Sequence, residues 1–68
     1  MSPQRPGLPH RVRILAHGED AEHIAREIEA EGGVRLDGTL YGFPTSTERD
    51  RVLGMLRFAH GLNIVRPE

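Results

Sequence analysis

Apolar residues recur along the chain in two alternating spacings, and the order of these spacings predicts six elements between Arg11 and Arg66. Four short segments have the apolar alternation or the β-branched content that is typical of strands. The middle pair flanks Asp37-Gly38, a dipeptide that favours a tight hairpin turn. The predicted strands are residues 11–16, 34–36, 39–43 and 62–65.

Between these strands, apolar residues recur three and four positions apart, which predicts two helices. Asp20 is a candidate cap for the first helix, and Gly32-Gly33 ends it. Thr45 and Glu48 have the spacing of a capping box for the second helix, which Gly61 ends. The apolar stripes consist of Ala21, Ile24, Ala25 and Ile28 in the first helix and of Val52, Met55, Leu56 and Ala59 in the second.

The order strand, helix, strand, strand, helix, strand is that of the split βαβ or ferredoxin-like sandwich. We therefore predict one α+β domain over residues 11–66, with a four-stranded antiparallel sheet that carries both helices on one face. Residues 1–10 are rich in proline and are predicted to form a flexible arm. Because this architecture hosts many unrelated activities, the side chains on the bare sheet face are the leading candidates for function.

The turn at Asp37-Gly38 decides which side chains the bare face carries. A two-residue loop buries Tyr41 and Phe43 under the helices and turns Arg35 outward. A three-residue loop over residues 36–38 shifts the pairing by one residue and brings both aromatic side chains to the bare face beside Arg35. We favour the two-residue loop because it buries more apolar area.

A small non-catalytic binding module is the function that this surface predicts. A chain of 68 residues has a thin core, and self-association is a natural remedy, so the expected partner is a second copy or another protein. The contact would use the bare sheet face or an edge strand. On the second helix, Phe58 lies off the apolar stripe, so it either anchors an interface or packs against the last strand or Leu8. The predicted sheet-face contacts are Arg13, Leu15, Arg35, Leu40 and Val65.

Single-stranded nucleic acid is the alternative partner. Residues 40–43 (LYGF) resemble part of the octamer on the third strand of RNA-recognition motifs, where aromatic residues alternate around a small one. The resemblance covers these few residues, and Arg13 stands where that family usually has an aromatic residue. It implies that bases stack on aromatic rings beside guanidinium groups. The residues of this alternative are Arg11, Arg13, Arg35, Tyr41 and Phe43.

Charge is unevenly distributed although the net charge is only −1. Residues 19–31 carry six acidic residues against Arg26, whereas the rest of the chain carries eight arginines against four acidic residues. All nine basic residues are arginine, which we interpret as the codon usage of a high-GC genome. The acidic helix is a solvated face, or a docking surface for arginines of a second copy or of a basic partner.

Metal and redox chemistry find little support in the sequence. The absence of cysteine excludes disulfides and thiolate metal sites. Heavy-metal-associated domains have a similar length and layout, but they need a cysteine pair where this chain has residues 17–20 (HGED). Glu19 and His23 lie one turn apart and offer two ligands, but no second helical pair completes a site. We therefore predict no metal and no other cofactor.

Catalysis and membrane insertion are not expected either. Ser46 lies in a helix-capping segment, and no glycine-rich phosphate loop follows a strand, so we predict no enzymatic activity. No apolar segment approaches membrane-spanning length, and residues 1–9 lack the apolar run of a signal peptide. We expect no membrane partner and a cytoplasmic location.

Overall fold

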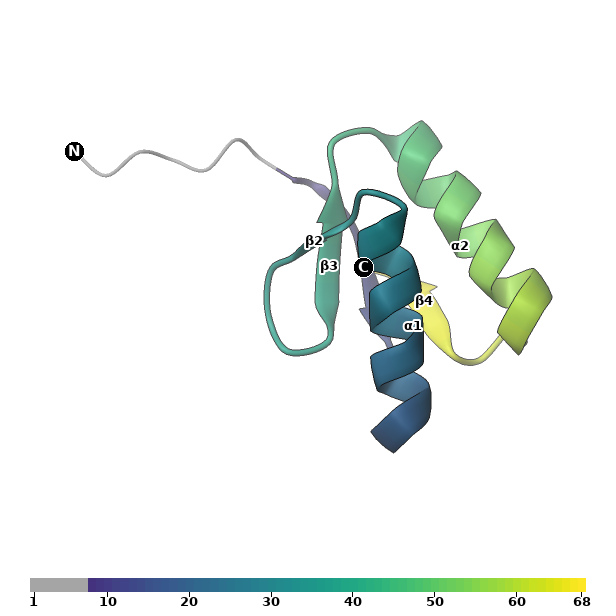
Figure 1. Ribbon diagram of the computed structural model, residues 1–68. Helices are drawn as coiled ribbons and strands as arrows, with labels where there is room; N and C mark the ends of the chain where they lie inside the picture. Colours follow the sequence, from purple (N-terminus) through teal and green to yellow (C-terminus); the bar gives the residue numbers. More distant parts are fainter. Residues whose placement is uncertain (1–7) are drawn as a thin grey trace.

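The computed structural model, which describes residues 8–68, has the predicted order of elements (Figure 1). It is an α+β sandwich of the ferredoxin-like type. Residues 1–7, which make up most of the predicted arm, lie outside the described residues. The elements are β1 His10–Ile14, α1 Gly18–Ala30, β2 Val34–Arg35, β3 Leu40–Phe43, α2 Ser46–His60 and β4 Val65–Pro67.

The four strands form one sheet in the order β2-β3-β1-β4, and every neighbouring pair is antiparallel. β1 and β3 are therefore central, and β2 and β4 form the edges. Two residues of the predicted arm belong to the folded part. His10 begins β1 opposite Phe43, and Leu8 lies against Gly42.

One hydrophobic core fills the space between the helices and a single face of the sheet. Both helices contribute to it, so both cover the same face, as predicted (Figure 1). Tyr41 and Phe43 are among the largest fully buried side chains. The buried core residues are Val12, Ile14, Tyr41, Phe43 and Val65 from the sheet, Ile24 and Ile28 from α1, and Val52, Leu53 and Leu56 from α2.

The two helices begin in different ways. At α2 one half of the predicted capping box forms, because the Thr45 hydroxyl accepts a hydrogen bond from the Glu48 amide at 3.2 Å. The Glu48 carboxylate accepts from the Thr45 hydroxyl at 3.3 Å rather than from the Thr45 backbone amide. The predicted cap Asp20 lies inside α1, whose N-cap His17 makes no side-chain cap bond. Asp20 instead stabilises the first turn through its charge near the positive end of the helix dipole.

The β2–β3 hairpin has a register that neither predicted loop provides. Its loop is Asp37-Gly38-Thr39, closed by hydrogen bonds from the Leu36 amide to the Leu40 carbonyl at 2.8 Å and from the Leu40 amide to the Asp37 carbonyl at 3.3 Å. The predicted two-residue loop is therefore wrong. The burial of Tyr41 and Phe43 that it implied is confirmed.

Compared with the predicted two-residue loop, this register places Val34 on the bare face of the sheet and Arg35 on the face that carries the helices. Val34 lies opposite Gly42 and Arg35 lies opposite Tyr41. Arg35 is thus on the helix side of the edge strand, and its predicted place on the bare face was wrong. Packing above Gly42 explains the register, because the Leu36 side chain covers this glycine closely and leaves no room for a Cβ atom.

The last strand also begins later than predicted. Residues 62–64 form a turn, and β4 begins at Val65. Val65 lies opposite Ile14 and is completely buried in the core, so its predicted place on the bare face was wrong. Arg66, which lies opposite Arg13, takes that place on the bare face.

Candidate functional site

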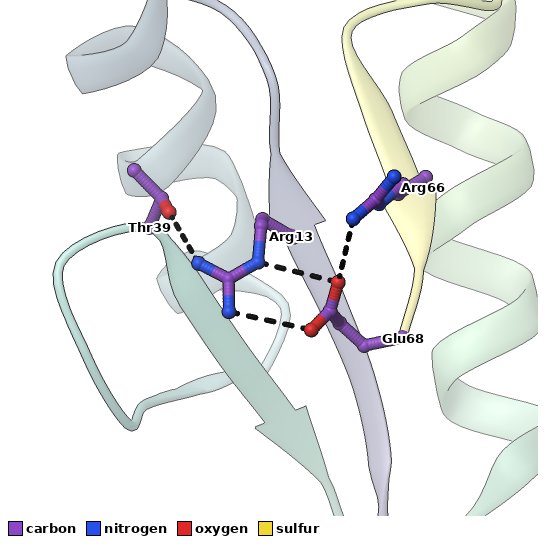
Figure 2. Close-up of polar contacts among 4 residues, drawn as sticks. All are labelled: Arg13, Thr39, Arg66 and Glu68. Atoms are coloured by element: carbon purple, nitrogen blue, oxygen red, sulfur yellow. Dashed lines mark hydrogen bonds and ion pairs between the residues drawn. The ribbon is translucent and has the colours of Figure 1, made fainter.

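The bare sheet face carries a closed group of polar contacts, drawn in Figure 2. The Arg13 guanidinium donates to the Thr39 hydroxyl at 3.0 Å and to Glu68 Oε1 at 3.3 Å. Its Nε lies 3.2 Å from Glu68 Oε2, which also accepts a hydrogen bond from Arg66 at 3.3 Å. Each of the three guanidinium nitrogens of Arg13 therefore has a partner within the chain, and Glu68 offsets part of the positive charge of this face.

The two arginines also act on the acidity of Glu68. The hydrogen bond from Arg13 lowers the pKa of the Glu68 carboxyl, and the charge of Arg13 and the contacts with Arg66 act in the same direction. Glu68 is thus ionised at neutral pH, when it holds both guanidinium groups. These contacts orient the arginines along the sheet rather than toward an approaching anion.

Four apolar side chains occupy the other part of the bare face. We call them the sheet-face cluster: Leu8, Val34, Leu36 and Leu40. The predicted contact Leu40 is nearly buried, whereas Val34 is 40 % exposed. The predicted contact Leu15 lies just beyond the end of β1 and is 38 % exposed. The cluster thus presents little apolar surface to a partner, although it lies on the predicted face.

The nucleic-acid alternative loses its stacking platform in this structure. Tyr41 and Phe43 lie under the helices with 2 % and 0 % exposure, so no base can stack on them without unfolding the core. Burial raises the pKa of the Tyr41 hydroxyl, and Glu29 raises it further, while Arg35 lowers it. Arg11 is exposed on the bare face, where its Nε donates to the Leu8 carbonyl at 3.3 Å.

The largest exposed apolar side chains lie at the end of α2. Phe58 is 95 % exposed, and Leu62, in the turn that follows the end of the helix at His60, is 72 % exposed. Gly54 lies one turn before Phe58, and a Cβ atom placed on it would meet no atom within 4 Å. We call Gly54 and Phe58 the α2 surface. Phe58 does not pack against the last strand or Leu8, which was the alternative to an interface role.

A cluster of metal-ligand types lies between the two helices. His23 and Glu27 are one turn apart on α1, and His60 is the last residue of α2. The Nε2 atoms of His23 and His60 lie 2.9 and 3.0 Å from the same oxygen, Glu27 Oε2. Of the described histidines, His10 and His17 are not part of this group.

This cluster was not predicted from the sequence. His23 was paired with Glu19, one turn before it, and the equally spaced Glu27 one turn after it was overlooked. That i, i+4 pair was a readable signal. The third member, His60, is 33 residues from Glu27 and comes near it only through the packing of the helices.

No protein-family model matches this chain, and comparison with curated proteins and with solved structures gave no match. Among residues 8–68, neither helix has the length and apolar character needed to cross a bilayer.

Proposed function

We propose that this protein is a non-catalytic binding module that associates with a second copy of itself through the α2 surface. The observation that carries the proposal is the 95 % exposure of Phe58 on a regular helix. Aromatic residues, phenylalanine among them, are enriched in the cores of protein interfaces, where they leave water on association. Leu62, just after the end of the helix, is a second exposed apolar side chain in this part of the chain.

The space at Gly54 makes this surface complementary to the same surface of a second copy. Side chains on a helix lean toward its N-terminus, so the Phe58 ring leans toward the open position at Gly54. When two α2 helices pack antiparallel around a two-fold axis, Phe58 of each copy comes opposite Gly54 of the other. Such a contact is self-complementary, as an isologous dimer requires. The absence of a side chain at Gly54 also lets the two helix backbones approach closely.

The thin core is the reason to favour a second copy over an unrelated protein. A domain of this length buries little apolar surface on folding, and association adds to that surface without additional sequence. The sheet is a weaker candidate for the contact. Its edges are short, with two residues in β2 and a proline in β4, so they offer few free backbone groups for strand addition.

Sedimentation equilibrium of the parent and of two apolar-to-glutamate variants tests the proposal. Phe58→Glu changes the α2 surface, and Leu15→Glu is the matched change at the end of β1 beside the sheet. We expect a dimer for the parent and for Leu15→Glu, and about 30-fold or more weaker dimerisation for Phe58→Glu. Equal melting temperatures for the two variants at low concentration show that both monomers are folded.

Two results would contradict the proposal. A parent protein that sediments as a monomer at every concentration contradicts self-association itself. A dimer that survives Phe58→Glu and is lost in Leu15→Glu places the contact at the sheet rather than on α2.

A further inference from the structure

The three side chains His23, Glu27 and His60 converge on one point although they come from two helices. We propose that they bind a divalent transition-metal ion of the zinc type. Both imidazole Nε2 atoms lie next to Glu27 Oε2, and the three ligand atoms lie within 4.8 Å of one another. The two rings are nearly perpendicular, at 83°, with their centroids 5.8 Å apart.

The spacing of these atoms is close to that of a tetrahedral metal site. Zinc bonds to imidazole nitrogen and carboxylate oxygen are about 2.0–2.1 Å long, so two tetrahedral ligand atoms lie about 3.3 Å apart. The two distances to Glu27 Oε2, 2.9 and 3.0 Å, differ from this value by a few tenths of an ångström. The third distance, between the two Nε2 atoms, is at most 4.8 Å, so binding of an ion requires the imidazole rings to rotate toward one another.

Hydrogen bonds among the three side chains also favour a metal site. Each imidazole can donate its Nε2 hydrogen to the Glu27 carboxylate, which holds the rings in place. A metal ion takes the Nε2 lone pair of each ring. In a neutral imidazole the Nε2 hydrogen then moves to Nδ1 through solvent, and an imidazolium also releases one proton. The ligands are thus assembled before the ion arrives. His23 is largely exposed, which leaves the site open to solvent.

Space for further ligands lies beside the cluster. A hollow of about 140 Å³ is lined by Asp20, His23, Ile24, His60 and Ile64. It has room for water molecules on the ion, and the Asp20 carboxylate lies about one helical turn before His23. Two imidazoles favour zinc, cobalt, nickel and copper over magnesium and calcium, which prefer sites made of oxygen atoms.

An ion at this position would join α1 to the end of α2. The helices otherwise meet through the thin core and through the ion pair at 3.0 Å between Arg51 of α2 and Glu31 at the end of α1. A further bond between them would stabilise the folded chain. Because the unfolded chain lacks the assembled ligands, metal binding raises the melting temperature by mass action. The site lies within one chain, so it is independent of the proposed dimer and has one ion per chain.

Calorimetric titration and thermal melts of the full chain test the site, with zinc chloride as the probe and magnesium chloride as the control ion. The parent is compared with His60→Ala, His23→Ala and the matched control His17→Ala, which removes an exposed histidine outside the cluster. We expect one zinc ion per chain and a melting temperature raised by several degrees in the parent and in His17→Ala. In His60→Ala and His23→Ala we expect zinc affinity to fall by about tenfold or more. Magnesium should have no effect.

Cobalt(II) absorption gives a second readout that does not depend on stability. Visible bands typical of four-coordinate cobalt are expected in the parent and in His17→Ala, and their loss in His60→Ala supports the assigned ligands. The site is refuted if zinc neither releases heat nor shifts the melt of the parent, or if His60→Ala and His23→Ala bind zinc as tightly as His17→Ala. Retained zinc binding in Phe58→Glu would show that the site does not depend on dimerisation.

Discussion

Leu36 covers Gly42 so closely that a Cβ atom on the glycine would lie 2.9 Å from Leu36 Cδ1 and 2.8 Å from Leu8 Cβ. Both contacts are shorter than van der Waals packing allows. We therefore expect Gly42→Ala to lower the free energy of unfolding by about 1–3 kcal/mol, because Leu36 and Leu8 must move away. Urea denaturation measures the change as a lower midpoint.

Gly38→Ala is the matched control for this prediction. Gly38 lies in the hairpin loop, where an added Cβ meets no atom within 4 Å, so its replacement should leave the midpoint nearly unchanged. Equal midpoints for the two alanine variants would show that the close packing of Leu36 over Gly42 does not form.

The contacts of Glu68 predict a pH dependence of stability with a definite sign. Its pKa in the folded chain is below the ordinary value of 4.5, so the ionised form stabilises the fold. The contribution is complete above pH 4.5 and is lost as the pH falls through the lowered pKa of the folded state. Parent and Glu68→Gln should differ in stability at pH 7, and the difference should shrink in acid.

NMR titration of the Glu68 carboxyl identifies the cause of this shift. In Arg13→Gln, which removes the main hydrogen-bond donor, the pKa should rise toward 4.5. In Arg11→Gln, a matched change on the same face outside this group of contacts, it should stay low. The same pKa in both variants would contradict the arrangement in Figure 2.

The burial of Tyr41 predicts both its fluorescence and its titration. It is the single tyrosine in a chain without tryptophan, so its signals need no deconvolution. Acrylamide should quench it weakly in the folded state and strongly in urea. Because burial raises its pKa above 10.0, stability should fall as the pH rises through 10.0 toward the higher value of the folded state. Strong quenching in the folded state would contradict the burial of Tyr41 under the helices.

Gly54 offers a prediction in which stability and association change in opposite directions. Gly54→Ala should stabilise the monomer by about 0.5–1 kcal/mol, since glycine is a poor residue inside a helix. Gly54→Leu should also favour the helix but fill the space that the proposed dimer gives to Phe58, and so weaken dimerisation. Melts at low concentration and sedimentation at high concentration separate the two effects. Unchanged dimerisation in Gly54→Leu would contradict the antiparallel α2 contact.

The element order could be predicted because each element has a local signal. Thr45 and Glu48 mark the start of α2 within four residues. In both helices the apolar residues of the stripe are only three or four positions apart. The register of β2 could not be read in this way. It depends on Leu36 and Leu8 packing over Gly42, and the sequence around Asp37-Gly38 is compatible with several loops.

The candidate site residues also differ in whether a local signal or a tertiary contact determines their position. Phe58 was a candidate because it lies off the helical stripe, which is a local property, and it is exposed. Val65 was assigned to the wrong face because its position follows from long-range pairing with Ile14. Arg35 was assigned to the wrong face because its pairing with Tyr41 depends on the hairpin loop, which the sequence leaves open. His60 could not be joined to His23 and Glu27 from the sequence, since that contact depends on how α2 packs against α1.

The central place of β1 determines when this chain is able to fold. β1 pairs with β3 and also with β4, and the contact between Arg13 and Glu68 spans 55 positions. One side of β1 therefore stays without a partner until β4 has left the ribosome. Because closing so long a loop costs entropy before any contact forms, this nonlocal pairing sets the pace of folding rather than the helices. Synthesis must reach β4 before the domain gains its full cooperativity.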